Sequence, residues 1–233
     1  MTDKVKSFGL SSNALKMIAL VAMTLDHIGV QILTDSELLR IIGRLAFPIF
    51  AYTIAEGCTH TKNRKRYALI IGATALLCQL VYFFAMQSLY QCIFVTFLLS
   101  IIIIYTFDKA VKSKSPIWWL FGVGLLLSVL FVTEFLPDIL YKTDFYIDYG
   151  FAGVMVPVLI YFAQGKASKL TAALFALSLL AFSVGGIQWY SLFALPIIAL
   201  YNGKRGTRRL KWFFYIYYPV HLVVIYAASL LIG

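Results

Sequence analysis

Long apolar runs separated by short polar breaks dominate the sequence. Most of these runs hold about 15–21 residues, and a helix that crosses a bilayer needs about 20. The pattern predicts nine spanning helices: Ala14–Leu33, Leu38–Gly57, Tyr67–Met86, Cys92–Phe107, Ile117–Glu134, Gly150–Phe162, Leu170–Val184, Ile187–Tyr201 and Trp212–Ile232. The sixth to eighth runs are short, and one of them also fits a re-entrant segment. We therefore expect an all-α, polytopic integral membrane protein.

Composition supports the same fold class. Of the 233 residues, 61% are hydrophobic and 13% are charged, whereas soluble domains are about 45–50% apolar and about 25% charged. No soluble domain, internal repeat or low-complexity linker interrupts the pattern, so residues 1–233 are predicted to form a single transmembrane domain. The first run carries Asp26 and His27 and is too long for a cleavable signal peptide. The three cysteines lack metal-type spacing, and their odd number argues against a disulfide framework.

The basic residues indicate how the chain is oriented. With the N-terminus in the cytoplasm, seventeen of the 20 lysines and arginines fall in inner segments, and only Arg40 and Lys142 fall in outer loops. The positive-inside rule therefore predicts a cytoplasmic N-terminus and an outer C-terminus in the plasma (inner) membrane. The net charge of +10 is then mainly a topology signal. A lipid bilayer is the predicted partner, and nucleic acid is not.

Four polar side chains lie at membrane depth: Asp26, His27, Arg44 and His221. A charge there costs roughly 2.5–3.5 kcal/mol on insertion scales, so such residues usually face a partner or a wet cavity. His27 lies six residues before the outer end of its run, and Arg44 lies six residues after the start of the next. At 1.5 Å per residue both are about 9 Å below the outer surface. His221 lies near the middle of the last run, so the four groups are predicted to line one cavity.

The phase of the first helix separates Asp26 from His27. Adjacent residues on a helix point about 100° apart, so we expect Asp26 to reach sideways, with Arg44 as one possible partner, and not to contact His27. Lys16 precedes His27 by eleven residues. This spacing is close to three turns, so the two side chains share one face about 16 Å apart. Lys16 would mark the cytoplasmic mouth of a passage whose deep end is His27.

Structural interpretations of these residues are also open. Asp26 and Arg44 could serve only to lock two helices together, and His221 could bond a neighbouring carbonyl. Lysines such as Lys16 commonly anchor helices at the inner surface. The basic loop in "CTHTKNRKRY" could be topology charge or a phosphate-binding surface. The histidines share no short spacing, so no metal site is predicted. Gly43, Arg44 and Pro48 are expected in one helical stretch that the proline kinks.

Four blocks of sequence resemble the TraX family: "LKMIALVAMTLDHIG", "GRLAFPIFAYTIAEGCTHTKNRKRY", "YGFAGV" and "KWFFYIYYPVHL". That family is named for a conjugal-transfer protein that acetylates the N-terminus of pilin. A basic residue eleven positions before a histidine, followed by an arginine in the next span, is more distantly similar to the acyltransferase-3 family. The lysosomal heparan-alpha-glucosaminide N-acetyltransferases form a comparable group. The resemblance covers the chain from its first span to its last.

The resemblance implies a membrane acetyltransferase with acetyl-CoA as its donor and no metal. Its acceptor would be a hydroxyl or amine on a protein N-terminus, a glycan or a lipid-linked group at the outer side. Basic cytoplasmic groups would hold the nucleotide phosphates; the candidates are Lys16, Lys62, Arg64, Lys65 and Arg66, and further along the chain Arg208 and Arg209.

The same resemblance suggests the roles of the deep residues. His27 would act either as the general base or as a carrier of the acetyl group. Asp26 would tune the site, Arg44 would pair with Asp26 or stabilise the oxyanion, and His221 would be a second proton-transfer group.

Two other functional classes fit the sequence. In a proton-coupled transporter, the four deep polar residues would form a relay. In a non-enzymatic membrane assembly protein, they would serve only helix packing. Flux without CoA would favour the transporter, and absence of CoA binding would favour the assembly protein. A homodimer is compatible with each class.

Overall fold

The structure is a computed structural model that describes residues 9–206 and 210–232. Its elements are α1 (Ser12–Gln31), α2 (Glu37–Gly43), α3 (Ala46–His60), α4 (Arg64–Met86), α5 (Ile93–Ser113), α6 (Pro116–Leu130), the π-helical turn η1 (Phe131–Phe135), α7 (Leu136–Ile139), α8 (Gly150–Phe162), α9 (Lys166–Val184), the 3₁₀ helix η2 (Gly186–Phe193), α10 (Ala194–Ala199) and α11 (Lys211–Ile232). Within the described residues, β-pairing is limited to two isolated bridges, Leu10 with Tyr201 and Gln91 with Ile147. Arg208 and Arg209 lie outside the described residues.

All nine predicted runs coincide with helical segments, and the all-α, multi-pass class is confirmed. In the described part of the chain, seven helices are long and apolar enough to cross a membrane. Two further apolar helices, Gly150–Phe162 and Gly186–Ala199, are shorter. The seventh run is longer than predicted, because α9 begins at Lys166 and not at Leu170. The prediction that these two short segments also cross the membrane stays a prediction.

The second predicted span is kinked. Its α2 half ends at Gly43 and its α3 half begins at Ala46, but Arg44 and Leu45 keep right-handed helical backbone angles, and Glu37–His60 is long and apolar enough to form one span. The expectation of one helical stretch that the proline kinks is therefore confirmed. The cause is Pro48. It has no N–H to bond the carbonyl four residues earlier, that of Arg44, and its ring crowds that carbonyl. The helix therefore kinks at Arg44 and Leu45, a full turn before the proline.

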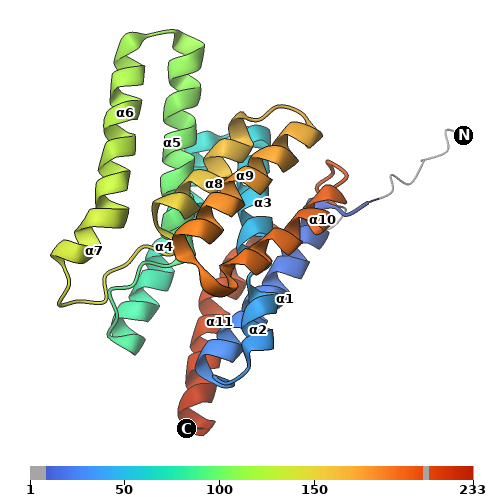
Figure 1. Cartoon of the computed structure of the whole chain (residues 1–233), viewed down its shortest axis with the longest axis vertical. Coiled ribbons are helices and arrows are strands. Elements are labelled where there is room, and N and C mark those ends of the chain that lie inside the picture. Colours follow the sequence, from blue (N-terminus) through green and yellow to red (C-terminus); the bar gives the residue numbers. More distant parts are fainter. Residues whose placement is uncertain (1–8, 207–209, 233) are drawn as a thin grey trace, which may run out of the picture.

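The core of the bundle lies where α3, α5 and α8 pack against one another, with α9 on the outer side of α8 (Figure 1). Ile49 of α3, Ile101 of α5 and Val154 of α8 are fully buried there. The helix α6 extends from the end of α5 along one edge and buries only two of its residues. Its exposed apolar side chains are what a lipid-facing helix requires. On the opposite side α11 contacts both α1 and α4, which brings the last span against the first.

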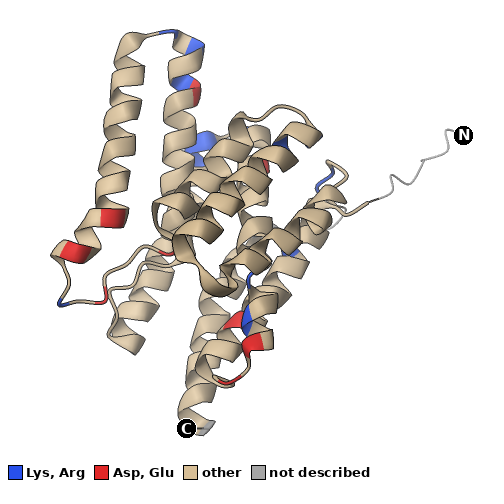
Figure 2. Ribbon diagram, in the orientation of Figure 1, with Lys and Arg blue, Asp and Glu red and all other residues tan. Residues whose placement is uncertain are grey.

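Most basic and most acidic side chains lie at opposite ends of the bundle (Figure 2). Most lysines and arginines lie at one end, with the α5–α6 connection and the start of α4, and we call this the basic end. Most acids lie at the other end, near the C-terminus of α1 and in α7. Glu56 and Asp108 are acids at the basic end, and each is paired with cations. This separation is what the positive-inside rule requires of a multi-pass protein. The assignment of the basic end to the cytoplasm stays a prediction.

Candidate active site

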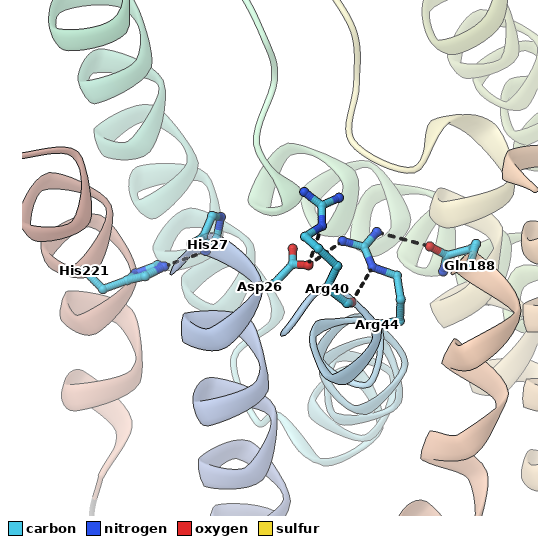
Figure 3. A network of polar contacts seen from close by, with 6 residues as sticks. All are labelled: Asp26, His27, Arg40, Arg44, Gln188 and His221. Carbon is cyan, nitrogen blue, oxygen red and sulfur yellow. Dashed lines mark hydrogen bonds and ion pairs between the residues drawn. The ribbon is translucent and has the colours of Figure 1, made fainter. Parts of the chain in front are cut away.

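Two histidines from opposite ends of the sequence meet inside the bundle. His27 on α1 and His221 on α11 approach until Nε2 of His221 lies 3.0 Å from Nδ1 of His27 (Figure 3). Their ring centroids are 4.9 Å apart. The side chain of His221 is buried. The structure therefore brings together two of the residues predicted to share a cavity, in direct hydrogen-bond contact.

The backbone around His221 assigns the tautomers of this pair. Nδ1 of His221 lies 3.2 Å from the carbonyl oxygen of Tyr217. A carbonyl only accepts, so that nitrogen carries a proton, and Nε2 of a neutral His221 is an acceptor. The partner nitrogen, Nδ1 of His27, must then donate. This leaves Nε2 of His27 with a free lone pair, as a base or a nucleophile requires.

Aromatic side chains hold His221 in this orientation. The ring of Tyr217 stacks on the imidazole at 5.4 Å with an interplanar angle of 12°, and Tyr218 meets it edge-on at 5.0 Å. The hydroxyl of Tyr217 is 2.9 Å from the hydroxyl oxygen of Thr24 on α1. Thr24 lies one turn before His27, so this contact also fixes the spacing of the two helices. The sequence pattern alone did not indicate these aromatic supports.

Asp26 points away from the histidines, towards α2 (Figure 3). Its Oδ1 accepts from Nη2 of Arg44 at 2.7 Å and lies 3.3 Å from Nε of Arg40. The prediction that Asp26 reaches sideways, away from His27, is confirmed, and the suggested pairing with Arg44 is present. Arg44 also donates to Oε1 of Gln188, on η2, at 3.4 Å. The deep polar residues thus form two adjacent networks, one of histidines and one around Asp26.

Arg40 and Gln188 were absent from the predicted site. Arg40 was counted as an outer-loop residue, but α2 starts at Glu37 and places it one turn before Arg44, on the same face. The four-residue spacing of the two arginines was the signal that could have identified it. Gln188 is 144 residues away from Arg44 in sequence. Only the packing of η2 against α2 reveals that contact.

The connection between α7 and α8 also reaches this region. It places Asp148 and Tyr149 against the core. Tyr149 stacks on Phe47 of α3 with ring centroids 4.1 Å apart. Burial raises the pKa of Asp148 to about 6, although a hydrogen bond from Tyr90 and the charge of Arg44 act in the opposite direction. Whether this segment receives an acceptor stays a prediction.

Gly43 permits the close approach of α1 and α2. A Cβ atom at this position would lie 2.3 Å from the Cβ of Asp26, a distance that real structures do not show. We predict that Gly43→Ala lowers the free energy of unfolding by about 1–3 kcal/mol, because the backbones must separate. Thermal unfolding in detergent measures this. Gly124→Ala on α6 is the control, since nothing lies within 4 Å of its new methyl group. Equal melting temperatures for the two variants would contradict the prediction.

A cavity of about 490 Å³ leads from the basic end towards the histidines. Ser12, Lys16, His60 and Arg205 line its mouth. Its deep end is lined by residues one turn before each histidine, Met23 on α1 and Tyr217 on α11, together with Phe94 and Tyr218. The volume is within the range of about 300–1,000 Å³ that is usual for small-molecule sites.

The face of α1 that lines this cavity is the predicted one. Lys16, Leu20 and Met23 all line it, and with His27 they follow the i, i+4, i+7, i+11 spacing of one helix face. The expectation that Lys16 lies at one end of this passage is confirmed. Its predicted role in phosphate binding is not tested by this placement and stays a prediction. The expectation that Asp26, His27, Arg44 and His221 line the passage is wrong for this cavity, because its lining ends one turn before the histidines.

The other predicted phosphate-binding residues lie elsewhere. Lys62, Arg64, Lys65 and Arg66 are absent from the lining of this cavity. Arg64 is paired with Asp108 at 2.7 Å. The residues with nitrogen side chains that do line the mouth beside Lys16 are His60 and Arg205. His60 also pairs with Glu56 at 3.4 Å. Glu56 itself lines the cavity and is bound by Lys169 of α9.

Sequence comparison shows which known proteins this chain resembles. The sequence model of the family described as TraX protein matches residues 11–229. The chain is 25% identical over 246 residues to a probable fimbrial assembly protein FimC (serogroup H1) of Dichelobacter nodosus, covering 97% of this chain and 98% of that one. It is 26% identical over 156 residues to the uncharacterized protein RP591 of Rickettsia prowazekii (strain Madrid E), covering 67% of this chain and 57% of that one. No solved structure matches significantly. Because the family model matches almost the whole chain, the chain belongs to the TraX family.

Proposed function

We propose that this protein is an acetyltransferase of the inner membrane. It takes an acetyl group from acetyl-CoA at the basic end and transfers it to an amine or hydroxyl near the opposite side. The observation that carries the proposal is the cavity that opens at the basic end and ends one helical turn before His27 and His221, which contact each other. The basic end faces the cytoplasm in the predicted topology, where acetyl-CoA is available. The resemblance to the TraX family supports the same donor.

The cavity suits the narrow arm of CoA better than its nucleotide. Phe50, Phe97 and Ile93 supply apolar walls, and Thr53 and Tyr67 supply scattered polar groups. The nucleotide would remain at the mouth, where Lys16 and Arg205 can neutralise phosphate charge. The thioester would then reach the deep end beside His27. This assignment replaces the basic loop at residues 62–66 as the principal phosphate contact.

The chemistry follows from the free lone pair on Nε2 of His27. The acceptor nucleophile attacks the thioester carbonyl while Nε2 takes its proton, which gives a tetrahedral intermediate. Collapse of the intermediate breaks the carbon–sulfur bond, and the proton on Nε2 passes to the leaving thiolate. The products are the acetylated acceptor and CoA thiol. His221 keeps Nδ1–H of His27 directed towards itself and shares the positive charge of the imidazolium. A covalent route through acetyl-His27 would use the same lone pair.

In this proposal Asp26 and Arg44 position the reacting helix and do not touch the donor. Their ion pair holds α1 against α2, on the side of α1 that faces away from His221. Gln188 extends the same contact to η2. A misplacement of about 1 Å can cost a large factor in rate, so a positioning network of this kind can matter for catalysis without contacting substrate.

The acceptor is proposed to be the N-terminal amine of a protein subunit. The Dichelobacter relative is named as a probable fimbrial assembly protein, and fimbriae are built from protein subunits. Acids at the outer end, including Asp35, Glu37 and Asp138, would favour a cationic amine over an anionic acceptor.

The proposal can be tested with purified protein in nanodiscs, where both membrane faces are accessible. Acetyl-CoA labelled in its acetyl group is incubated with short peptides whose N-terminus is either free or blocked. We expect release of CoA thiol and transfer of label to the free peptide alone. Transfer to serine-containing blocked peptides would move the acceptor class to hydroxyls. If acetyl-CoA neither shifts the melting temperature nor loses its thioester, the assembly-protein alternative is supported instead.

His221 offers a narrower test of the mechanism. We predict that His221→Phe, which keeps a ring against Tyr217 but removes the acceptor for His27, lowers kcat by roughly 10- to 100-fold. The KM for acetyl-CoA should change little, because the cavity walls remain. Steady-state thiol release at varied acetyl-CoA measures both quantities. A rise in KM with unchanged kcat would show that His221 shapes the cavity and does not assist His27.

A further inference from the structure

A second cleft, of about 590 Å³, lies between α4 and α5 at the basic end. It is lined by Arg64, Lys65, Ala68, Tyr105, Asp108, Lys109, Lys112 and Ser113. None of these residues lines the cavity that leads to the histidines. The cleft is therefore a separate site, and neither the proposed transfer reaction nor its positioning network uses it.

The charges of the cleft are strongly unbalanced towards positive. Four cations face one carboxylate, that of Asp108. Oδ2 of Asp108 binds Nη1 of Arg64 at 2.7 Å and Nζ of Lys112 at 2.8 Å, and Tyr161 donates to the other oxygen at 3.1 Å. A single carboxylate thus orders two cations side by side, and the four cations of the cleft keep most of their charge uncompensated. Such an array of donors from Arg and Lys matches a phosphate group.

The surroundings of the cleft are apolar and face outwards. Next to Arg64 and Lys65 on α4, Leu69 is 71% exposed, and between the two lysines of α5, Val111 is 53% exposed. Nζ of Lys109 lies 3.6 Å from the centroid of the Trp118 ring at the start of α6. Lysine and tryptophan together mark the interface between hydrocarbon and water. The cleft is thus at headgroup level, with a lipid-facing surface directly beneath it.

We propose that this cleft binds the phosphate of an anionic phospholipid from the leaflet at the basic end. The phosphate would lie between α4 and α5, and the acyl chains would follow the exposed apolar side chains of α4 and α6. Basic pockets between spanning helices on the cytoplasmic side recognise lipid headgroups in this way. A soluble phosphate ligand would not use the adjoining apolar surface, and the walls of the main cavity are not shared. This lipid would hold the α5–α6 hairpin against α4.

The test uses the full chain in mixed nanodiscs of phosphatidylcholine and phosphatidylglycerol, with bound lipid counted by native mass spectrometry. The variant is Lys65→Gln combined with Lys109→Gln, which leaves the ion pairs of Asp108 intact. The matched control is Lys114→Gln combined with Lys166→Gln, two exposed lysines at the same end that lie outside the cleft. We expect the cleft variant to retain phosphatidylglycerol roughly tenfold less well than the wild type. The control variant should retain it as the wild type does.

Two results would overturn the proposal. Equal retention of phosphatidylglycerol by the cleft and control variants would show only a general attraction of basic protein for anionic lipid. Displacement of the lipid by free CoA, with weaker CoA binding in the cleft variant alone, would assign the cleft to the nucleotide. Failure of the acetyl-transfer assay would leave the lipid result unaffected, because the two sites share no residue.

Discussion

Replacement of His27 by alanine is expected to reduce acetyl transfer by about 10²–10⁴-fold, the usual contribution of a positioned general base. The loss should appear in kcat, since the imidazole lies beyond the walls that would hold the donor. Thiol release and labelled product measure the effect together. If His27 carries the acetyl group covalently, the same variant also loses any label that the wild-type protein retains after denaturation.

Binding of acetyl-CoA by the same variant serves as the control. His27→Ala should bind acetyl-CoA and show a thermal shift with it comparable to that of the wild type. A variant that transfers at the wild-type rate with a competent acceptor would remove His27 from the mechanism. A variant that no longer binds the donor would make His27 part of the binding site and not the base.

Replacement of Asp26 by alanine is expected to destabilise the protein by about 3–5 kcal/mol, which is the usual cost of removing one partner from a buried ion pair. The side chains of Asp26 and Arg44 are only 18% and 12% exposed, so the arginine would keep its charge with little water. Unfolding in detergent, followed by circular dichroism, measures the change. Asp35→Ala removes an exposed acid from the adjacent loop and should have little effect.

A double-mutant cycle isolates the pair from other effects of these substitutions. Arg44→Ala should be less costly in the Asp26→Ala background than in the wild type, because no buried partner then remains to be lost. Arg40 would retain its own charge in both backgrounds. Strict additivity of the two single changes would show that the contact between Asp26 and Arg44 contributes nothing to stability.

Phase along single helices was predictable from sequence. The helical period gave the face of α1 that Lys16 shares with His27. The sideways direction of Asp26, about 100° from that of His27, followed from the same geometry. The depth of His27 in the membrane stays a prediction. The nine apolar runs were equally readable, because a bilayer demands long stretches without polar residues.

Other features depended on relations that sequence spacing does not encode. Gln188 reaches the Asp26 network only through the packing of η2. The basic loop and the cavity mouth both carry cations, and charge alone does not say which of them faces the cavity. That is why Arg205 was missed while Arg64 was assigned to a phosphate.

In the proposed reaction the donor enters from the basic end and presents its sulfur to His27. The most direct measurement is a structure of the full chain in a nanodisc with CoA bound. We predict that the arm of CoA fills the cavity between α1, α3 and α11, with its thiol about 3–4 Å from Nε2 of His27, the separation expected of reacting groups. CoA bound in the cleft between α4 and α5, or a cavity that remains empty at saturating CoA, would contradict the account.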